Sequence, residues 1–299
     1  MKLSELTTEE RNDKSKNIDS VSTLEMLQIM NTEDQKVPQA ISKVLPQIAK
    51  AVDLAVPKFK AGGRLIDVGA GTSGRLGVLD SVELTPTYSV SPDRTFALIA
   101  GGKDAIFEAV EGAEDNREKG REDLEKVALT DNDIVTGLSA SGRTPYVVAA
   151  LEYAKQLGAL TISVSCNQNS EMSKIAQVGI DVPVGPEVVT GSTRMKAGTA
   201  QKLVLNMIST GIMIKSGKVY QNLMINVQAT NEKLVERGIR IVSQATQKSF
   251  AEARAIFDQA GKQVNVAILM IELQLSREQA QELLKRNDGN IAEIIRDTR

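Results

Sequence analysis

Histidine is absent from this chain of 299 residues, and cysteine occurs once, at Cys166. Without histidine the chain cannot form a Ser-His-Asp triad, a Cys-His pair or a histidine-based metal site. With one cysteine it cannot form an internal disulfide, a thiolate zinc cluster or a CxxC redox pair. Acid–base chemistry near neutral pH would therefore fall to carboxylates, lysine, tyrosine or bound water.

Aromatic residues and excess charge are also scarce. Tryptophan is absent and aromatics make up 3% of the chain, which leaves little for stacking on sugars or nucleobases. The formal net charge of −2 does not indicate nucleic acid as a partner. The polar N-terminus lacks the apolar core of a secretory signal, and no apolar run approaches the ~20 residues of a membrane-spanning helix. We expect a cytoplasmic protein with a small-molecule ligand and no membrane partner.

Apolar runs that alternate with helical patterns dominate the middle of the chain. Continuous apolar runs of this kind, separated by helices, predict an α/β fold with a doubly wound parallel sheet. We expect an N-terminal helical segment over 1–56, a sheet-containing domain over 57–220 and a small helical module over 239–299. The strands are expected at 64–68, 95–100, 133–138, 160–164 and 178–182. Helical patterns are expected at 38–59, from the seventies to about Val82, at 103–127 with a break at Gly112, and at 197–215. A last helical pattern over 276–299 is expected to be capped by Ser276 and interrupted at Asp288-Gly289.

A glycine-rich loop, Gly69-x-Gly71-x-x-Gly74, follows the first strand and opens a helix. This is the dinucleotide fingerprint in pattern and context. However, the next strand ends in Ala-Gly-Gly instead of the acidic residue that holds a ribose. A P-loop is also excluded, because Arg75-Leu76 stands where Lys-Ser/Thr is required. We therefore expect no nicotinamide and no other cofactor.

A second loop, Ser139-Ala-Ser-Gly-Arg-Thr-Pro145, also lies between a strand and a helix. Its hydroxyls, a glycine that permits close backbone approach, and proline in the first helical turn are typical of an anion site at a helix N-terminus. The alternative is that serine and threonine merely cap the helix. A third polar run, Gly191–Thr199, could close the same site or cap the helix that follows.

These loops resemble the phosphate-binding loops of the sugar isomerase (SIS) domain, a flavodoxin-like fold. The segments 69–76, 110–116, 139–147 and 189–207 together resemble the N-acetylmuramic acid 6-phosphate etherase family, and the likeness runs from Thr8 through the C-terminal helices. This family cleaves the lactyl ether of the 6-phosphorylated amino sugar with water. The resemblance implies a homodimer with no metal, and a C-terminal module of the ubiquitin-associated type without any ubiquitin partner.

The resemblance also implies the residues of the site. The family's two catalytic carboxylates match Glu83 and Glu114, for which we expect the roles of general acid and of base at C2. An acid role requires burial to raise the pKa of Glu83, and Val82 and Leu84 could supply it. Thr85 departs from a proline that is common in the family. The residues expected to bind substrate or phosphate are Gly71, Thr72, Ser73, Ser139, Ser141, Gly142, Thr144, Ser192 and Lys196.

Several interpretations stay open at this point. Arg75, Arg143, Arg194 and Lys196 could meet the substrate's anionic groups or form ion pairs. The acidic residues after Glu114, beginning with Asp115, have the pattern of a solvated charge run. A phosphosugar-binding regulator without catalysis, or an aldose–ketose isomerase, would share the scaffold.

Overall fold

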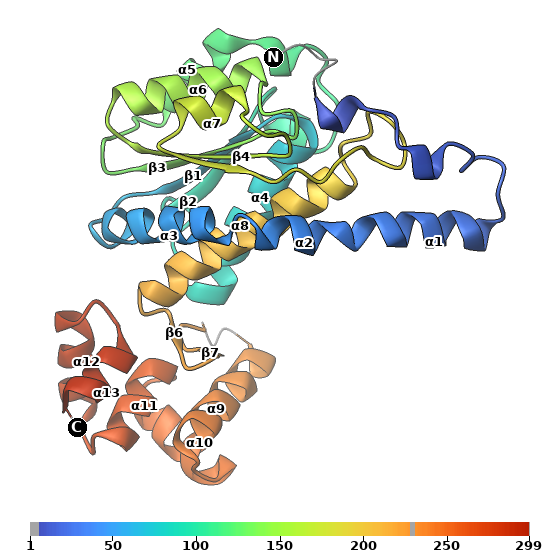
Figure 1. Cartoon of the computed structure of the whole chain (residues 1–299). Helices are drawn as coiled ribbons and strands as arrows, with labels where there is room; N and C mark the ends of the chain where they lie inside the picture. The colour runs from blue at the N-terminus through green and yellow to red at the C-terminus, as the bar shows by residue number, and fades with distance from the viewer. Residues whose placement is uncertain (1–5, 228–230, 299) are drawn as a thin grey trace. The chain divides into compact units, whose positions relative to one another are not determined.

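The computed structural model describes residues 6–227 and 231–298, which fold as two compact units (Figure 1). The first unit comprises the residues up to Val82 together with Asp93–Ser209. The second comprises Glu83–Pro92 and the residues from Thr210 onward. Among the described residues, no helix is both long and apolar enough to cross a membrane.

The first unit is built on a five-stranded parallel sheet. Its strands are β1 (Leu65–Gly69), β2 (Thr95–Ile99), β3 (Ile134–Leu138), β4 (Leu160–Ser165) and β5 (Val178–Asp181). The spatial order β2-β1-β3-β4-β5 confirms the predicted flavodoxin-like sheet. The order reverses between β1 and β3, and open α/β sheets bind ligands at the carboxyl ends of the strands at this point.

Both faces of the sheet are covered. Ile66, Val68 and Val135 pack with Leu124 and Leu151 in one core cluster. Helices α5 (Arg117–Lys126), α6 (Pro145–Gln156) and α7 (Glu171–Ile175) cover that face, and α3 (Leu45–Lys60) covers the other (Figure 1). Side chains alternate along a strand, so Asp67 points to the face opposite its neighbours Ile66 and Val68.

Several helices differ from their predicted bounds. The pattern at 38–59 forms two helices, α2 (Lys36–Ser42) and α3, after α1 (Thr23–Asp34). The helical pattern over 103–127 is confirmed only in its last part: α5 follows the break expected at Gly112, whereas short 3₁₀ turns, η4 (Lys103–Ile106) and η5 (Ala113–Asp115), precede it. The physical reason is backbone geometry, because Gly101, Gly102 and Gly112 have φ of +90°, +73° and +71°.

The two helices that follow the first and third loops are long. Helix α4 (Gly71–Tyr88) extends beyond the predicted end near Val82, and α8 (Lys196–Lys215) matches its prediction closely. Pro86 lies inside α4. It falls in the last turn, where little of the helix remains to be broken.

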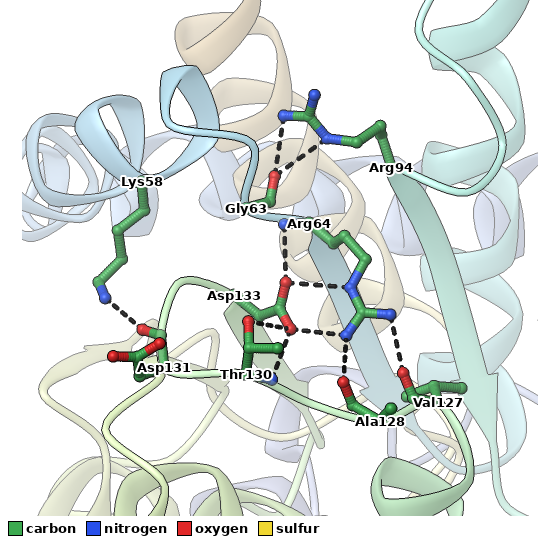
Figure 2. A network of polar contacts seen from close by, with 9 residues as sticks. All are labelled: Lys58, Gly63, Arg64, Arg94, Val127, Ala128, Thr130, Asp131 and Asp133. Atoms are coloured by element: carbon green, nitrogen blue, oxygen red, sulfur yellow. Dashed lines mark hydrogen bonds and ion pairs between the residues drawn. The ribbon is translucent and has the colours of Figure 1, made fainter.

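A polar network lies at the amino ends of the strands, opposite the predicted site (Figure 2). The Arg64 guanidinium lies 2.6 Å from the carboxylate of Asp133, whose side chain is 2% exposed. Burial alone would raise the pKa of Asp133, but hydrogen bonds from the Arg64 side chain and from the backbone of Thr130 and Arg64 lower it to about 2. Arg94 donates to the Gly63 carbonyl beside them. This network joins the segments that enter β1, β2 and β3.

The second unit is mainly helical, as predicted, and begins with a two-stranded hairpin, β6 (Val219–Tyr220) and β7 (Leu223–Met224). Val242, Phe257 and Ile268 are fully buried in its core. Ser249 and Ser276 each form a capping box at a helix start, and the second of these is the cap predicted at 276. Its helices are α9 (Glu232–Thr246), α10 (Phe250–Gln259), α11 (Val264–Glu272), α12 (Arg277–Arg286) and α13 (Ile291–Thr298).

Candidate active site

A pocket of about 400 Å³ opens in the first unit at the loops that follow β1 and β3. It is walled by these two loops, by η5, by Thr193 from the third polar run and by the N-terminal segment. The lining residues are Glu9, Ala70, Gly71, Thr72, Ser73, Glu114, Asp115, Ala140, Ser141, Arg143, Thr144, Pro145 and Thr193. The structure therefore brings together six of the predicted site residues: Gly71, Thr72, Ser73, Glu114, Ser141 and Thr144.

The loop after β3 is organised around Ser139. Its hydroxyl lies 2.7 Å from Thr144 Oγ1 and 3.1 Å from Ser141 Oγ, and it accepts the Gly142 N–H at 3.1 Å. Ser139 is 3% exposed, so it shapes the loop while Ser141 and Thr144 face the pocket. Thr144 is the N-cap residue of α6, yet its side chain makes no capping hydrogen bond. The capping alternative therefore does not account for this hydroxyl.

Gly142 cannot be replaced without disturbing this loop. Its φ is +70°, and a Cβ at this position would lie 2.4 Å from Ser170 Cβ. Its carbonyl accepts the Met172 N–H at 3.0 Å, which fixes the loop to the start of α7. Gly142 thus acts through backbone geometry, and its role in the site is to let the loop turn tightly.

The loop after β1 supplies the facing wall. Gly71 has a φ of +52° at the start of α4, Thr72 is half-buried and Ser73 is buried. Arg75, which was open to either an anionic group or an ion pair, contacts backbone carbonyls. Its guanidinium donates to the carbonyls of Ile106 and Glu108 at 3.0 and 3.1 Å, so it braces the segment that leads to η5.

Glu114 enters the pocket from η5, which follows the left-handed Gly112. Its side chain is exposed, and it also lines a smaller adjoining pocket of about 160 Å³. One part of that second pocket is apolar and is lined by Ala100, Ala105, Ala109, Val110 and Ala113, and the charged residues Arg75, Glu108 and Glu111 line the rest with Glu114. Asp115 also lines the larger pocket, and its side chain is exposed, as expected for a solvated charge.

Glu83 lies inside α4 and not beyond a helix end as predicted, and it belongs to the second compact unit. Its side chain is exposed. Leu84 is buried, but Val82 is 62% exposed, so the chain does not provide the burial by both neighbours that was expected. Ser81, Leu84 and Tyr88 are buried and share one face of α4 at helical spacing, so Val82 and Glu83 fall on its exposed face.

Lys196 was predicted to bind substrate, but in this structure it is not among the residues that line the pocket. Its side chain is 1% exposed, and its Nζ lies 2.7 Å from Glu33 Oε2, which is equally buried. Burial would raise the pKa of Glu33, but hydrogen bonds from Lys196, Lys36 and Asn12 lower it to about 2. The Lys196 and Ala197 N–H groups donate to the Glu187 carboxylate at 3.0 and 2.9 Å and so cap α8.

The third polar run contributes Thr193 to the pocket, whereas Ser192 is not among its described lining residues. Arg194 is exposed, and Arg143 lines the pocket. Cys166 and Tyr146 are fully buried and belong to the core. Burial raises the pKa of the Cys166 thiol to about 12.

Two buried carboxylates lie below the start of α4. Asp80 accepts hydrogen bonds from Asn206 Nδ2 at 2.6 Å and Ser209 Oγ at 3.1 Å, which tie α4 to α8. Burial, and then the charge of Asp80, raise the pKa of Asp67 well above its ordinary value. Burial also raises the pKa of Asp80. These residues support the helix that carries Thr72 and Ser73 at its start.

Glu9 is the pocket residue that sequence reasoning missed. It comes from the polar N-terminal segment, which has no periodicity to indicate a role. The available signal was the segment Thr8–Asn12, which is part of the family resemblance.

Comparison with known proteins identifies the fold of this domain. Residues 47–155 match the family model for the glucokinase regulatory protein N-terminal SIS domain, and residues 120–210 match the SIS domain. A solved putative phosphosugar isomerase involved in capsule formation from Bacteroides fragilis has a TM-score of 0.50 at 20% identity, covering 67% of this chain and 95% of its own. That likeness shows the fold alone.

Curated relatives cover the whole chain. N-acetylmuramic acid 6-phosphate etherase 1 of Enterococcus faecalis is 57% identical over 99% of this chain and 98% of its own length. N-acetylmuramic acid 6-phosphate etherase of Lactobacillus acidophilus is 54% identical over 99% of this chain and 100% of its own. The chain therefore belongs to the N-acetylmuramic acid 6-phosphate etherase family.

Proposed function

We propose that this chain cleaves the D-lactyl ether of N-acetylmuramic acid 6-phosphate with water, giving N-acetylglucosamine 6-phosphate and D-lactate. The observation that carries the proposal is the position of Glu114. This carboxylate lines the same pocket as the hydroxyl-rich loop after β3, in a chain whose full-length relatives are etherases. The reaction would make the chain a carbon–oxygen lyase that acts on a cell-wall amino sugar.

The two adjoining pockets suit the parts of this substrate. Ser141, Thr144 and the first N–H groups of α6 would hold the 6-phosphate, because hydroxyl and backbone donors at a helix N-terminus favour an anion. Thr72 and Ser73 would complete the donors from the opposite wall. The alanine-lined part of the smaller pocket would accept a methyl-bearing substituent such as the N-acetyl group. We assign the phosphosugar-binding loops to the domain 57–220, which lies between the helical segments 1–56 and 239–299, and the first of these segments adds Glu9 to the pocket lining.

The chemistry follows from the open-chain sugar, whose C1 aldehyde makes the C2 proton acidic. Glu114 would take that proton, and the electron pair would form a C2–C3 double bond as the C3–oxygen bond breaks. Glu83 would protonate the departing lactate oxygen. Water would then add at C3 after giving a proton to the Glu83 carboxylate, and Glu114 would return its proton to C2. The sequence of steps is redox-neutral and consumes one water.

We further propose that the chain acts as a cytoplasmic homodimer. Leu79 and Val82 on α4 and Met207 on α8 are 52%, 62% and 40% exposed. Exposed apolar residues on long helices are typical of an interface between copies. Light scattering would test this state, since a monomer at micromolar concentration would contradict it.

The direct test is incubation of the purified chain with N-acetylmuramic acid 6-phosphate, followed by analysis of the products. The proposal predicts equal amounts of D-lactate and N-acetylglucosamine 6-phosphate. An isomerised sugar without lactate would favour the isomerase, and tight binding without any product would favour a phosphosugar-binding regulator.

A further inference from the structure

The N-terminal segment of residues 6–15 runs beside the pocket as a strap that is fixed at both ends. At its start Leu6 and Thr8 are fully buried. Asn167 holds this end, because its Nδ2 donates to Thr8 Oγ1 at 3.0 Å and its Oδ1 accepts from Thr7 Oγ1 at 3.0 Å. The start of the strap is therefore built into the core of the first unit.

The same asparagine connects the strap to the loop after β3. Asn167 Nδ2 also donates to the carbonyl of Ala140, at 3.0 Å, and Ala140 is itself a pocket residue. At the far end Asn12 Nδ2 donates to Glu33 Oε2 at 3.0 Å, and Ser15 Oγ donates to the Val188 carbonyl at 2.7 Å. The strap is thus held in a fixed position relative to the loop.

Glu9 is the strap residue that faces the pocket. It ends the 3₁₀ turn η2 (Thr7–Glu9), is half-buried and lines the pocket with Thr72 and Ser141. A Cβ placed on Gly191 would lie 3.8 Å from Glu9 Oε2, so the carboxylate sits near the third polar run. The next residue, Glu10, is exposed.

We propose that Glu9 is a substrate-binding residue that accepts hydrogen bonds from the neutral donors of a sugar phosphate, its hydroxyl or amide N–H groups. An ionised carboxylate has acceptors and no donor, so it can pair only with donors on the ligand. The phosphate is provided with donors elsewhere in the pocket, and like charges near Glu9 would repel it. Glu9 therefore binds the hydroxyl groups of the carbon chain. It disfavours a ligand that places a second anion next to the Glu9 carboxylate. This inference rests on the proposed function for the class of ligand.

Calorimetric titration of Glu9→Gln tests this role, with Glu10→Gln as the matched control on the same strap. The two probes are N-acetylglucosamine 6-phosphate and methyl phosphate, which has the phosphate without the sugar. Glu9→Gln should weaken binding of the sugar phosphate by about 10- to 100-fold, because a charge-assisted hydrogen bond is lost. It should leave methyl phosphate binding unchanged, and Glu10→Gln should change neither.

The outcomes separate this inference from the proposed reaction. Wild-type affinity of Glu9→Gln for the sugar phosphate, or an equal loss for both probes, would overturn the role of Glu9 even if lactate is released. A selective loss with Glu9→Gln in a chain that releases no lactate would leave Glu9 as a binding residue and overturn the etherase. A wild-type chain that binds neither probe would overturn both.

Discussion

Lys196 and Glu33 form a buried ion pair, with Nζ 2.7 Å from Oε2 and both side chains 1% exposed. The pair joins the first residue of α8 to helix α1, far away in the sequence. Glu33 also accepts from Asn12, at the far end of the strap that carries Glu9. The ion pair thus helps to hold the far end of the strap in place.

Glu33→Gln should destabilise the fold strongly, because it leaves the Lys196 ammonium buried without a carboxylate. We expect the free energy of unfolding at pH 7 to fall by about 3–5 kcal/mol in urea denaturation. Glu33→Leu combined with Lys196→Met should recover part of that loss. If Lys196→Met instead kept full stability and weakened sugar phosphate binding, Lys196 would be a ligand of the substrate after all.

Asp133→Asn should show a pH-dependent loss of stability. The pKa of Asp133 is about 2 in the folded chain, below its ordinary value of 3.8, so its ionised form stabilises the fold. That contribution is fully present above the ordinary pKa and is lost as the pH falls from there toward about 2. We expect a loss of about 3 kcal/mol at pH 7 that shrinks below pH 4. The exposed Asp131→Asn is the control, and a loss independent of pH would contradict the ion-pair account.

Asp67→Asn should show the opposite pH dependence. Burial and the Asp80 charge raise the pKa of Asp67, so its protonated form is favoured in the folded chain. The stability that Asp67 contributes is present below its unfolded pKa and is lost as the pH rises toward its folded pKa. Asparagine cannot ionise, so the stability of the variant relative to wild type should rise between pH 4 and pH 8. A relative stability that stays constant over this range would show that Asp67 is ionised in the fold.

Ser139→Ala should weaken phosphosugar binding by about tenfold or more, because three polar contacts that shape the loop are lost. Gly142→Ala should lower both binding and stability, since its φ of +70° and the 2.4 Å approach to Ser170 Cβ leave no room for a methyl group. Calorimetric titration measures the affinity for the phosphosugar, and thermal melting measures the stability. Wild-type affinity in Ser139→Ala would mean that the loop does not hold the ligand.

Local sequence signals were sufficient to predict the sheet and the two main loops. The β-branched runs located each strand to within about one residue, because continuous apolar runs have few alternatives in a parallel sheet. The loop 139–145 was recognisable since its hydroxyls, glycine and proline act over a few neighbouring residues. The end of α4 could not be predicted in this way. Thr85-Pro86 is a plausible end for a helix, but α4 continues to Tyr88.

The remaining site residues depend on contacts that no local pattern encodes. Lys196 pairs with a residue 163 positions away, and its charge alone could not distinguish that partner from a phosphate. Glu9 reaches the pocket because its neighbour Thr8 accepts a hydrogen bond from Asn167, 159 positions along the chain. In both cases a polar residue of ordinary appearance acquires its role from a buried partner on a distant element.

The proposed catalytic pair, Glu83 and Glu114, is tested by two variants that keep the side-chain shape. Glu114→Gln should still bind the sugar phosphate but lose exchange of the C2 proton with deuterated solvent, because the proposed base is gone. Glu83→Gln should retain that exchange and lose lactate release. Unimpaired exchange in Glu114→Gln, or near-normal lactate release in Glu83→Gln, would remove the corresponding role.

The central claim is elimination followed by hydration at C3, and oxygen-18-labelled water tests it most directly. The chain would be incubated with N-acetylmuramic acid 6-phosphate in this water, and both products analysed by mass spectrometry. We expect one labelled oxygen at C3 of N-acetylglucosamine 6-phosphate and none in D-lactate. Label in the lactate, or no lactate at all, would contradict the account.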